Sequence, residues 1–444
     1  MATAIPAPGP KGNFLVGTGI EFARDPLGFL TRCAREYGDV VRIRLVHMPV
    51  YLINHPDLLE EVLVTKNSNF IKSLDLRETR NVLGSGLLTS EGEFWRRQRR
   101  LAQPAFRHER IADYARIMTK YAERTMAGWR DGETRDIHSD MMRLALEIAA
   151  KALFDADVSK DVYAVGAAVE TVMKQWTTRS NTAFLLPHYF PTPGNLRAWK
   201  AVQRLDEILY GIIGQRRASP RNNGDLLAML MEARDDDGKP MTDQQLRDET
   251  VTLLLAGHET TAIALSWTWY LLAQHPEVEA KLVAELRAVL AGRPPTIEDL
   301  PRLVYTEKVI RETMRLYPPA WAIGREAIRD CEIGGYFIPA RSGLYLNQWV
   351  THRDPRFYPE PERFNPDRWT EEFANNLPKF AYFPFGGGPR VCIGAGFAMM
   401  EATLLLATIA QQFHFSLASA EPVKPWPSIT LRPQKGVPVV LARR

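Results

Sequence analysis

A run of about 33 residues between Thr242 and Pro276 constrains the fold most, because it contains no proline and is largely apolar. Thr242 and Gln245 have the spacing of a capping box at a helix start, and Pro276 ends the pattern. A helix of this length spans about 50 Å, so it must pass through the core of the domain. The Gly-His-Glu sequence at 257–259 interrupts the apolar run, which favours a buried helix over a membrane span.

The other periodic segments are mostly helical. Helices are predicted from about 26 to 37, 303 to 316 and 396 to 413, and strands from about 40 to 45, 50 to 53, 331 to 338 and 429 to 441. The predicted fold class is therefore mainly α with small β-sheets. No internal repeat or low-complexity linker divides the chain, so we expect a Pro/Gly-rich extension over residues 1–24 and a single domain over residues 25–444.

Charge and cysteine content exclude several classes of function. Lysine and arginine number 56 and aspartate and glutamate 52, and the resulting net charge of +4 is too small to predict nucleic-acid binding. The three cysteines lie far apart, which is typical of a reducing compartment. The N-terminal residues lack the charged and apolar regions of a signal peptide, so we expect a cytoplasmic protein without a stable membrane anchor.

The strongest chemical signal is the glycine-rich segment 385–394, which contains Cys392 and precedes the last predicted helix. A thiolate that ligates a metal needs a tight loop whose backbone N–H groups turn toward the sulfur, and glycines permit that geometry. The N-terminus of the following helix also favours negative charge on the sulfur. For an isolated cysteine, an inert buried thiol in a glycine-rich turn is the alternative.

The sequence FGGGPRVCIG at 385–394 resembles the haem-binding signature of the cytochrome P450 family, Phe-x-x-Gly-x-Arg-x-Cys-x-Gly, at every fixed position. The resemblance implies that Cys392 ligates the iron of haem b (iron protoporphyrin IX), where thiolate donation favours O–O bond cleavage. It also implies that Phe385 packs beside the sulfur, that Arg390 pairs with a haem propionate and that Gly394 belongs to the cofactor loop.

A second motif, AGHETT at 256–261, lies in the middle of the central helix. Glycine costs a helix up to about 1 kcal/mol relative to alanine, and threonine side chains can bond back to the preceding turn, so the helix should be weakened or bent here. The motif resembles the oxygen-binding motif of the P450 family, which places Ala256 and Gly257 at the groove for O2. The resemblance implies that Thr260 donates a hydrogen bond to bound oxygen and that Glu259 helps to relay protons to it. A satisfied polar patch on a buried helix is the alternative.

Two further sets of residues match family patterns that concern the haem propionates. Trp95 and Arg99 are four residues apart on one helix face and resemble the family's Trp-x-x-x-Arg pair, which reaches a propionate. An amphipathic surface helix is the alternative for this pair. Arg325 follows a Pro-Pro turn at the place where many relatives keep another propionate-binding arginine.

A structural lock is expected behind the haem. Glu312 and Arg315 are three residues apart and can pair on one helix face, although such pairs are weak alone. Downstream, the sequence PERFNPDRW at 361–369 resembles the family's meander. The resemblance implies that Arg363 completes a buried Glu-Arg-Arg triad.

The implied reaction is a monooxygenation that inserts one atom of O2 into a lipophilic small molecule, by hydroxylation or epoxidation. Electrons are expected from a separate ferredoxin or flavodoxin with its reductase, since no redox domain follows the P450 pattern in this sequence. The expected docking patch comprises Arg96, Arg97, Arg99 and Arg100, and a solvated basic helix face is the alternative. A peroxide-driven peroxygenase and a non-enzymatic haem-thiolate sensor are the alternative functions, and both are disfavoured by the Glu259–Thr260 pair.

Family position also predicts the walls of the substrate pocket. The expected lining residues are apolar or aromatic: Leu87, Leu88, Phe184, Leu253, Ala264, Trp321, Ile323 and Ile429. Such walls favour a lipophilic substrate, which the resemblance narrows to a terpenoid, carotenoid, steroid or fatty-acid-like molecule.

Overall fold

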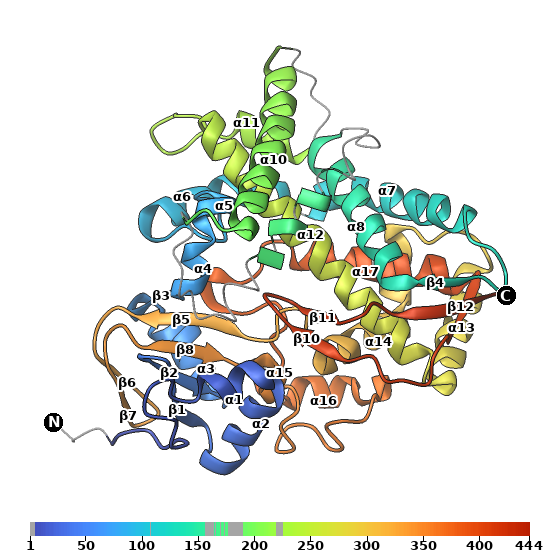
Figure 1. The fold of residues 1–444 in the computed structure, drawn as a ribbon. Coiled ribbons are helices and arrows are strands. Elements are labelled where there is room, and N and C mark those ends of the chain that lie inside the picture. The colour runs from blue at the N-terminus through green and yellow to red at the C-terminus, as the bar shows by residue number, and fades with distance from the viewer. Residues whose placement is uncertain are drawn as a thin grey trace.

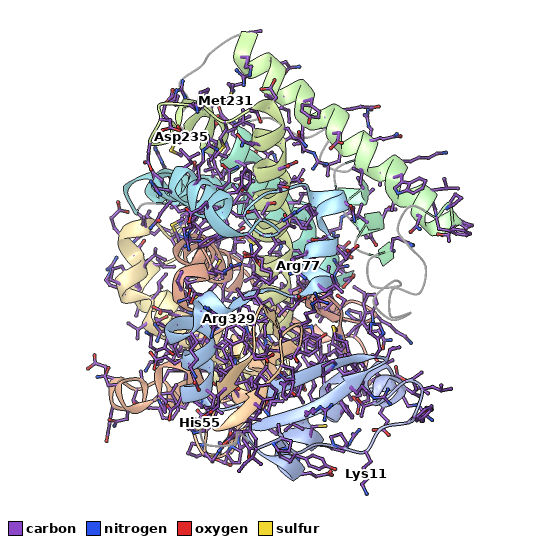
Figure 2. All side chains as sticks on the ribbon, turned by 90° about the vertical axis from the view of Figure 1, so that its left-hand side faces the viewer. Lys11, His55, Arg77, Met231, Asp235 and Arg329 are labelled. Carbon is purple, nitrogen blue, oxygen red and sulfur yellow. The ribbon has the colours of Figure 1, made fainter. Side chains whose placement is uncertain are left out.

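The computed structural model describes residues 5–106, 108–155, 164, 166–168, 170–172, 174–175, 190–218 and 225–444. In these residues helices predominate, and the strands form one five-stranded sheet and smaller two- and three-stranded ones (Figure 1). The predicted class, mainly α with small β-sheets, is confirmed. In the side view, Met231 and Asp235 mark the helical end of the molecule, and His55 and Lys11 mark the end formed by the five-stranded sheet (Figure 2).

The longer helices carry most of the core, and the shorter ones connect them. The longer helices are α2 (Pro26–Tyr37), α6 (Gly92–Ala102), α7 (His108–Ala127), α8 (Ile137–Phe154), α10 (Pro193–Ala218), α12 (Asp243–Leu272), α13 (Pro276–Leu290), α14 (Val304–Leu316) and α17 (Ala395–Ala410). The shorter ones are α1 (Gly19–Arg24), α3 (Pro56–Glu60), α4 (Leu74–Glu78), α5 (Arg80–Leu83), α11 (Leu226–Glu232), α15 (Gln348–Thr351) and α16 (Glu371–Asn376).

Helix α12 is the predicted central helix, and its start follows the local sequence. Gln245 N donates to Thr242 Oγ1 at 3.2 Å and Thr242 N donates to Gln245 Oε1 at 2.9 Å, which is the expected capping box. The helix has 30 residues and is therefore about 45 Å long. It runs diagonally through the centre of the molecule, where α8, α10, α14 and α17 pack against it (Figure 1).

The core around α12 is aromatic in its second half. Trp267 is fully buried and stacks on Tyr317, with ring centroids 4.1 Å apart. Its indole Nε1 donates a hydrogen bond to the Leu431 carbonyl at 2.8 Å, so the helix is tied to a late strand. This contact joins segments that are far apart in the sequence.

The five-stranded sheet has the order β1-β2-β8-β5-β3 and combines early and late strands: β1 (Val40–Leu45), β2 (Met48–Ile53), β3 (Phe70–Lys72), β5 (Ile323–Ala327) and β8 (Gly343–Leu346). The predicted hairpin is formed by β1 and β2, with Val40 opposite Ile53. Both faces of this hairpin are covered, since Val40 packs in one apolar cluster and Val41 in another, beside Leu30 of α2. Covering on both faces explains why the strand sequence is not a clean alternation of apolar and polar residues.

The smaller sheets are formed by strands that come late in the chain, with one exception. They contain β4 (Thr134–Asp136) with β9 (Phe413–Leu417) and β12 (Pro438–Arg443), then β6 (Cys331–Ile333) with β7 (Tyr336–Ile338), and β10 (Pro425–Pro427) with β11 (Leu431–Pro433). Among the helices that the structure describes, none combines the length and the apolar character needed to cross a bilayer.

Candidate active site

A large cavity lies between α12 and the glycine-rich segment 385–394. Its volume is about 1140 Å³, and its lining is mostly apolar. Apart from Phe184, which lies outside the described residues, every predicted substrate-pocket residue lines it: Leu87, Leu88, Leu253, Ala264, Trp321, Ile323 and Ile429. A single small ligand usually occupies a pocket of about 300–1,000 Å³, so this cavity has room for a cofactor and a substrate together.

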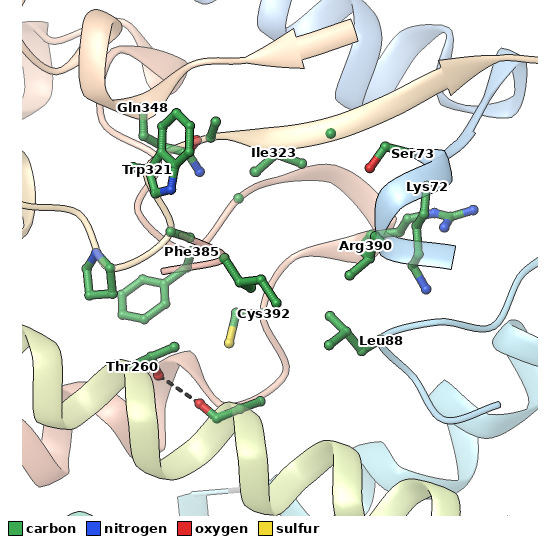
Figure 3. A pocket seen from close by; sticks show the side chains of 18 of the residues that line it. Lys72, Ser73, Leu88, Thr260, Trp321, Ile323, Gln348, Phe385, Arg390 and Cys392 are labelled. Carbon is green, nitrogen blue, oxygen red and sulfur yellow. Dashed lines mark hydrogen bonds between the residues drawn. The ribbon is translucent and has the colours of Figure 1, made fainter. Parts of the chain in front are cut away.

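Cys392 lies in the floor of the cavity. Its backbone N–H donates to the Phe385 carbonyl at 2.9 Å, which closes the turn around the sulfur. Gly388 adopts a φ of 65°, and a Cβ at this position would come within 1.9 Å of the Leu63 carbonyl oxygen, so only glycine fits. The exposed surface of Cys392 faces the cavity, and the sulfur points toward α12 (Figure 3).

The electrostatic environment of Cys392 combines burial with two opposing influences. Burial raises the pKa of the thiol, whereas a hydrogen bond from the Gly394 backbone and the positive charge of Arg99 lower it. Phe385 and Gly394 also line the cavity, as predicted. A bound metal cation would favour the thiolate further.

Opposite Cys392, one face of α12 forms the other side of the cavity. Ala256, Gly257, Thr260 and Ala264 all line it. The Thr260 hydroxyl donates to the Ala256 carbonyl at 2.8 Å, and it faces the sulfur across the open space (Figure 3). Thr261 Oγ1 donates a second such bond, to the Gly257 carbonyl at 3.3 Å. In both cases the threonine hydroxyl shares a carbonyl that the helix backbone also uses, as expected for this turn.

Glu259 does not reach the cavity. Its buried carboxylate points to β11, where it pairs with Arg432, whose Nε lies 2.8 Å from Glu259 Oε1, and accepts a hydrogen bond from Thr430. Of the predicted acid–alcohol pair, the structure therefore places the alcohol at the cavity, whereas the acid, about 100° further around the helix, is turned away from it.

A cluster of cations lines the cavity beside the Cys392 loop. Arg390 and Arg325 were predicted there, and the structure adds Lys72 of β3, which lies directly opposite Arg325 of β5 in the sheet register. Burial, together with the charge of Arg390, lowers the pKa of Lys72 to about 7 and that of Arg325 to about 10. Glu91 is the carboxylate that faces this cluster, with Arg390 Nη1 at 2.7 Å and Lys72 N at 2.7 Å.

Trp95 and Arg99 of α6 complete this end of the cavity, as predicted. The Arg390 guanidinium lies 5.1 Å from the centroid of the Trp95 ring, and the Lys72 ammonium 6.0 Å from it. Like charges opposite each other in a sheet are destabilising unless an anion lies between them. A cavity with a cysteine sulfur in its floor and a group of cations at one end fits haem b, whose iron takes a thiolate and whose two propionates are carboxylates.

Sequence reasoning missed Lys72 and Glu91. The signal that would reveal Lys72 is its register opposite Arg325, which only strand pairing defines. Glu91 directly precedes α6, and its sequence context does not distinguish it from Glu93, which is exposed.

The buried triad exists, but Arg363 is not part of it, which corrects the sequence prediction. Glu312 accepts hydrogen bonds from Arg315 Nε at 2.9 Å and from Arg368 Nε at 2.9 Å, and all three side chains are buried. Arg363 points into solvent and pairs with Glu360 at 3.1 Å, while its backbone carbonyl accepts from Arg315. Both arginines belong to the same irregular segment, so their spacing from the helix does not decide which one turns inward.

The arginines of α6 do not form the free basic patch expected for a redox partner. Arg96 pairs with Glu93, Arg97 Nε lies 2.7 Å from Asp235, and Arg100 pairs with Asp236, while Arg99 faces the cavity. Acidic residues of the segment after α11 thus neutralise two of the arginines, and these residues are more than a hundred positions away in the sequence.

Comparison with known proteins agrees with this geometry. The sequence model of the Cytochrome P450 family matches residues 7–439. Cyclooctatin synthase of Streptomyces melanosporofaciens is 39% identical, with 97% of this chain and 94% of the relative covered, and pentalenene oxygenase of Streptomyces avermitilis is 33% identical, with 95% and 94% covered. The structure of retinoic acid bound cyanobacterial CYP120A1 superposes with a TM-score of 0.90 at 28% identity and covers 100% of both chains.

The chain therefore belongs to the cytochrome P450 family, whose members carry haem b on a cysteine thiolate. It is an oxygenase of the monooxygenase class, like its named relatives, which include cyclooctat-9-en-7-ol 5-monooxygenase of Streptomyces melanosporofaciens at 36% identity over 94% of this chain and 89% of the relative.

Proposed function

We propose that the protein hydroxylates or epoxidises a terpenoid-like substrate, with electrons from a separate ferredoxin or flavodoxin. The observation that carries this proposal is the large apolar cavity between Cys392 and Thr260, since apolar walls bind a hydrocarbon skeleton by burying it. Of the substrate classes that the sequence leaves open, terpenoids are supported best. The relatives named for cyclooctatin and pentalenene align with more than 90% of the length of this chain.

The residues that line the cavity have different roles. Cys392 would hold the iron of a bound haem, and the cation cluster of Arg390, Arg325, Lys72 and Arg99 would hold its propionates. When bound, haem supplies the oxidation of the substrate by activated O2. The apolar walls orient the substrate and exclude water from the reacting carbon.

Thr260 holds a proton at the cavity surface. Its hydroxyl is anchored on the Ala256 carbonyl, so it can donate a hydrogen bond into the cavity only if that bond is given up. Protons would reach Thr260 by way of the buried Glu259–Arg432 pair, which lies beside the cavity-lining face of α12. Within the AGHETT motif, the Thr260 hydroxyl lines the cavity, whereas the Glu259 carboxylate does not.

The first test is the difference spectrum of the dithionite-reduced protein with and without carbon monoxide. A strongly red-shifted Soret band is expected, and Cys392→Ser should abolish it, whereas Cys331→Ser, at a half-buried cysteine of β6, should leave it unchanged. A band of the same position in Cys392→Ser would show that Cys392 is not the ligand.

The second test is turnover of pentalenene with a ferredoxin, its reductase and NADPH, followed by product analysis. An oxygenated product is expected, and Thr260→Ala should consume electrons with less product formed. Product formation driven only by hydrogen peroxide would indicate a peroxygenase. A haem-thiolate spectrum without turnover of any terpenoid, steroid, carotenoid or fatty acid would favour a sensor.

A further inference from the structure

The segment Gly84–Ser90, here called the wall loop, carries two of the cavity's apolar residues. Leu87 and Leu88 both line the cavity, and Leu88 reaches into it close to Arg390 (Figure 3). The loop lies between α12 on one side and β3 on the other. Its position therefore sets the shape of this side of the cavity.

The side of the wall loop that faces α12 is held by two carboxylates. Asp248 Oδ2 accepts from Ser85 N at 2.7 Å, and Glu249 Oε2 accepts from Leu87 N at 3.0 Å. Glu249 is fully buried, although it is ionisable. Asp248 is balanced by Arg247 at 3.1 Å, while Glu249 has no such neighbour on α12.

The opposite side of the wall loop is held by Lys72. Its Nζ donates to the carbonyls of Leu87 and Ser90, at 2.7 Å each. The backbone N–H and carbonyl of Leu87 are thus both bound by buried ionisable side chains, one from α12 and one from β3. Burial raises the pKa of Glu249 to about 7 and lowers that of Lys72 to about 7, so each of these buried groups carries a desolvation cost.

The backbone of the loop also approaches α12 closely. A Cβ at Gly86 would lie 2.3 Å from Thr252 Oγ1 and 2.6 Å from the Asp248 carbonyl oxygen. Glycine is therefore required for this contact. An apolar loop that packed against the helix by burial alone would need neither the glycine nor two buried ionisable residues.

We propose that Glu249 and Lys72 are positioning residues that clamp the wall loop from both sides, and that Glu249 thereby determines which ligands fit against Leu87 and Leu88. This inference rests on the proposed function, since it concerns the substrate side of the same cavity. Glu249 does not line the cavity, so it acts on a ligand through the Leu87 backbone, to which it is hydrogen-bonded, or through its charge interaction with Lys72. Glu249→Gln, which keeps the acceptor and removes the charge, separates these two routes.

The test uses the haem-loaded protein and two nitrogen ligands of haem iron that differ in size, imidazole and 4-phenylimidazole. In Glu249→Ala the spectral dissociation constant of 4-phenylimidazole should rise about tenfold, because losing a hydrogen bond to a charged acceptor releases the wall loop. The constant for imidazole, which is too small to span the cavity, should change less than about twofold. Glu249→Gln keeps an acceptor oxygen for Leu87 N and should bind both ligands as the wild type does.

Equal changes for both ligands, or no change for either, would overturn the proposal. If Glu249→Ala does not retain haem, Gly86→Ala decides, because its Cβ must push the wall loop away from α12; the same selective loss of 4-phenylimidazole supports the proposal, and unchanged selectivity refutes it. A wild-type protein without the red-shifted carbon monoxide band would overturn the proposed function itself, and this inference with it.

Discussion

Replacing Arg368 with alanine should destabilise the protein strongly, whereas the same change at Arg363 should have almost no effect. Arg368 Nε lies 2.9 Å from Glu312 Oε1, and its Nη1 donates to the Pro359 carbonyl at 2.9 Å. The Arg368 side chain is buried, and Arg363 is exposed. The comparison therefore separates two arginines that have nearly the same sequence context.

The magnitude follows from what remains after the change. Breaking a buried ion pair costs about 3–5 kcal/mol, chiefly because the surviving charge is left uncompensated. In Arg368→Ala, Glu312 keeps two bonds from Arg315, at 2.9 Å each, and one each from Trp369 Nε1 and Asn365 N, at 3.0 Å. Arg368→Ala should therefore lower the free energy of unfolding by about 3 kcal/mol, the lower end of that range. Glu312→Ala leaves two buried guanidinium groups without a carboxylate and should cost about 5 kcal/mol.

Urea unfolding followed by far-UV circular dichroism, with haem content measured in parallel, provides the assay. Arg363→Ala should stay within about 0.5 kcal/mol of the wild type, as expected for an exposed side chain. A loss of stability in Arg363→Ala that equals the loss in Arg368→Ala would refute the assignment of the inward arginine.

Three other changes test the energetics around α12. Burial raises the pKa of the Glu401 carboxyl from 4.5 to about 8, so between these pH values the folded protein keeps a proton that the unfolded chain has lost, and stability falls by about 1.4 kcal/mol per pH unit. Glu401→Gln should remove this part of the slope in urea titrations at several pH values, and an unchanged slope would contradict it. Arg432→Met leaves Glu259 buried without its cation and should cost about 3–5 kcal/mol, most of which Glu259→Gln in the same chain should restore. Trp267→Phe leaves the Leu431 carbonyl unpaired and should lower the free energy of unfolding by about 1–3 kcal/mol, whereas a change below about 0.5 kcal/mol would mean that another donor replaces the indole.

Much of the fold was predictable because its signals are local. Helix α2 spans the residues predicted for it, since Asp25 accepts from Gly28 N at 3.0 Å and Gly38, with a φ of 93°, ends the helix. The capping box of α12 is equally local. Each of these ends is set by residues within four positions of one another, so no distant partner could change the outcome.

The motif residues that line the cavity were also predictable, because the motif sequence fixes their backbone. The glycines of the Cys392 loop permit the turn that points the sulfur toward α12, and helical periodicity puts Ala256, Thr260 and Ala264 on one face. The same periodicity turns Glu259 about 100° away from that face, but its partner Arg432 could not be inferred from the sequence. The sequence thus located the site but not all the contacts within it.

By itself, then, the sequence determined both ends of α2, the start of α12, the Cys392 loop and the apolar character of the cavity, each of which depends on neighbouring residues or on a fixed period. The end of the last helix was predicted less well, since α17 ends at Ala410 rather than at about 413, where β9 begins. Only the tertiary structure decided which arginine binds Glu312, that Lys72 joins the cation cluster and that the arginines of α6 are neutralised. These outcomes depend on which charged side chains meet after distant segments have packed. A long charged side chain can turn inward or outward, and the residues next to it in the sequence do not indicate which.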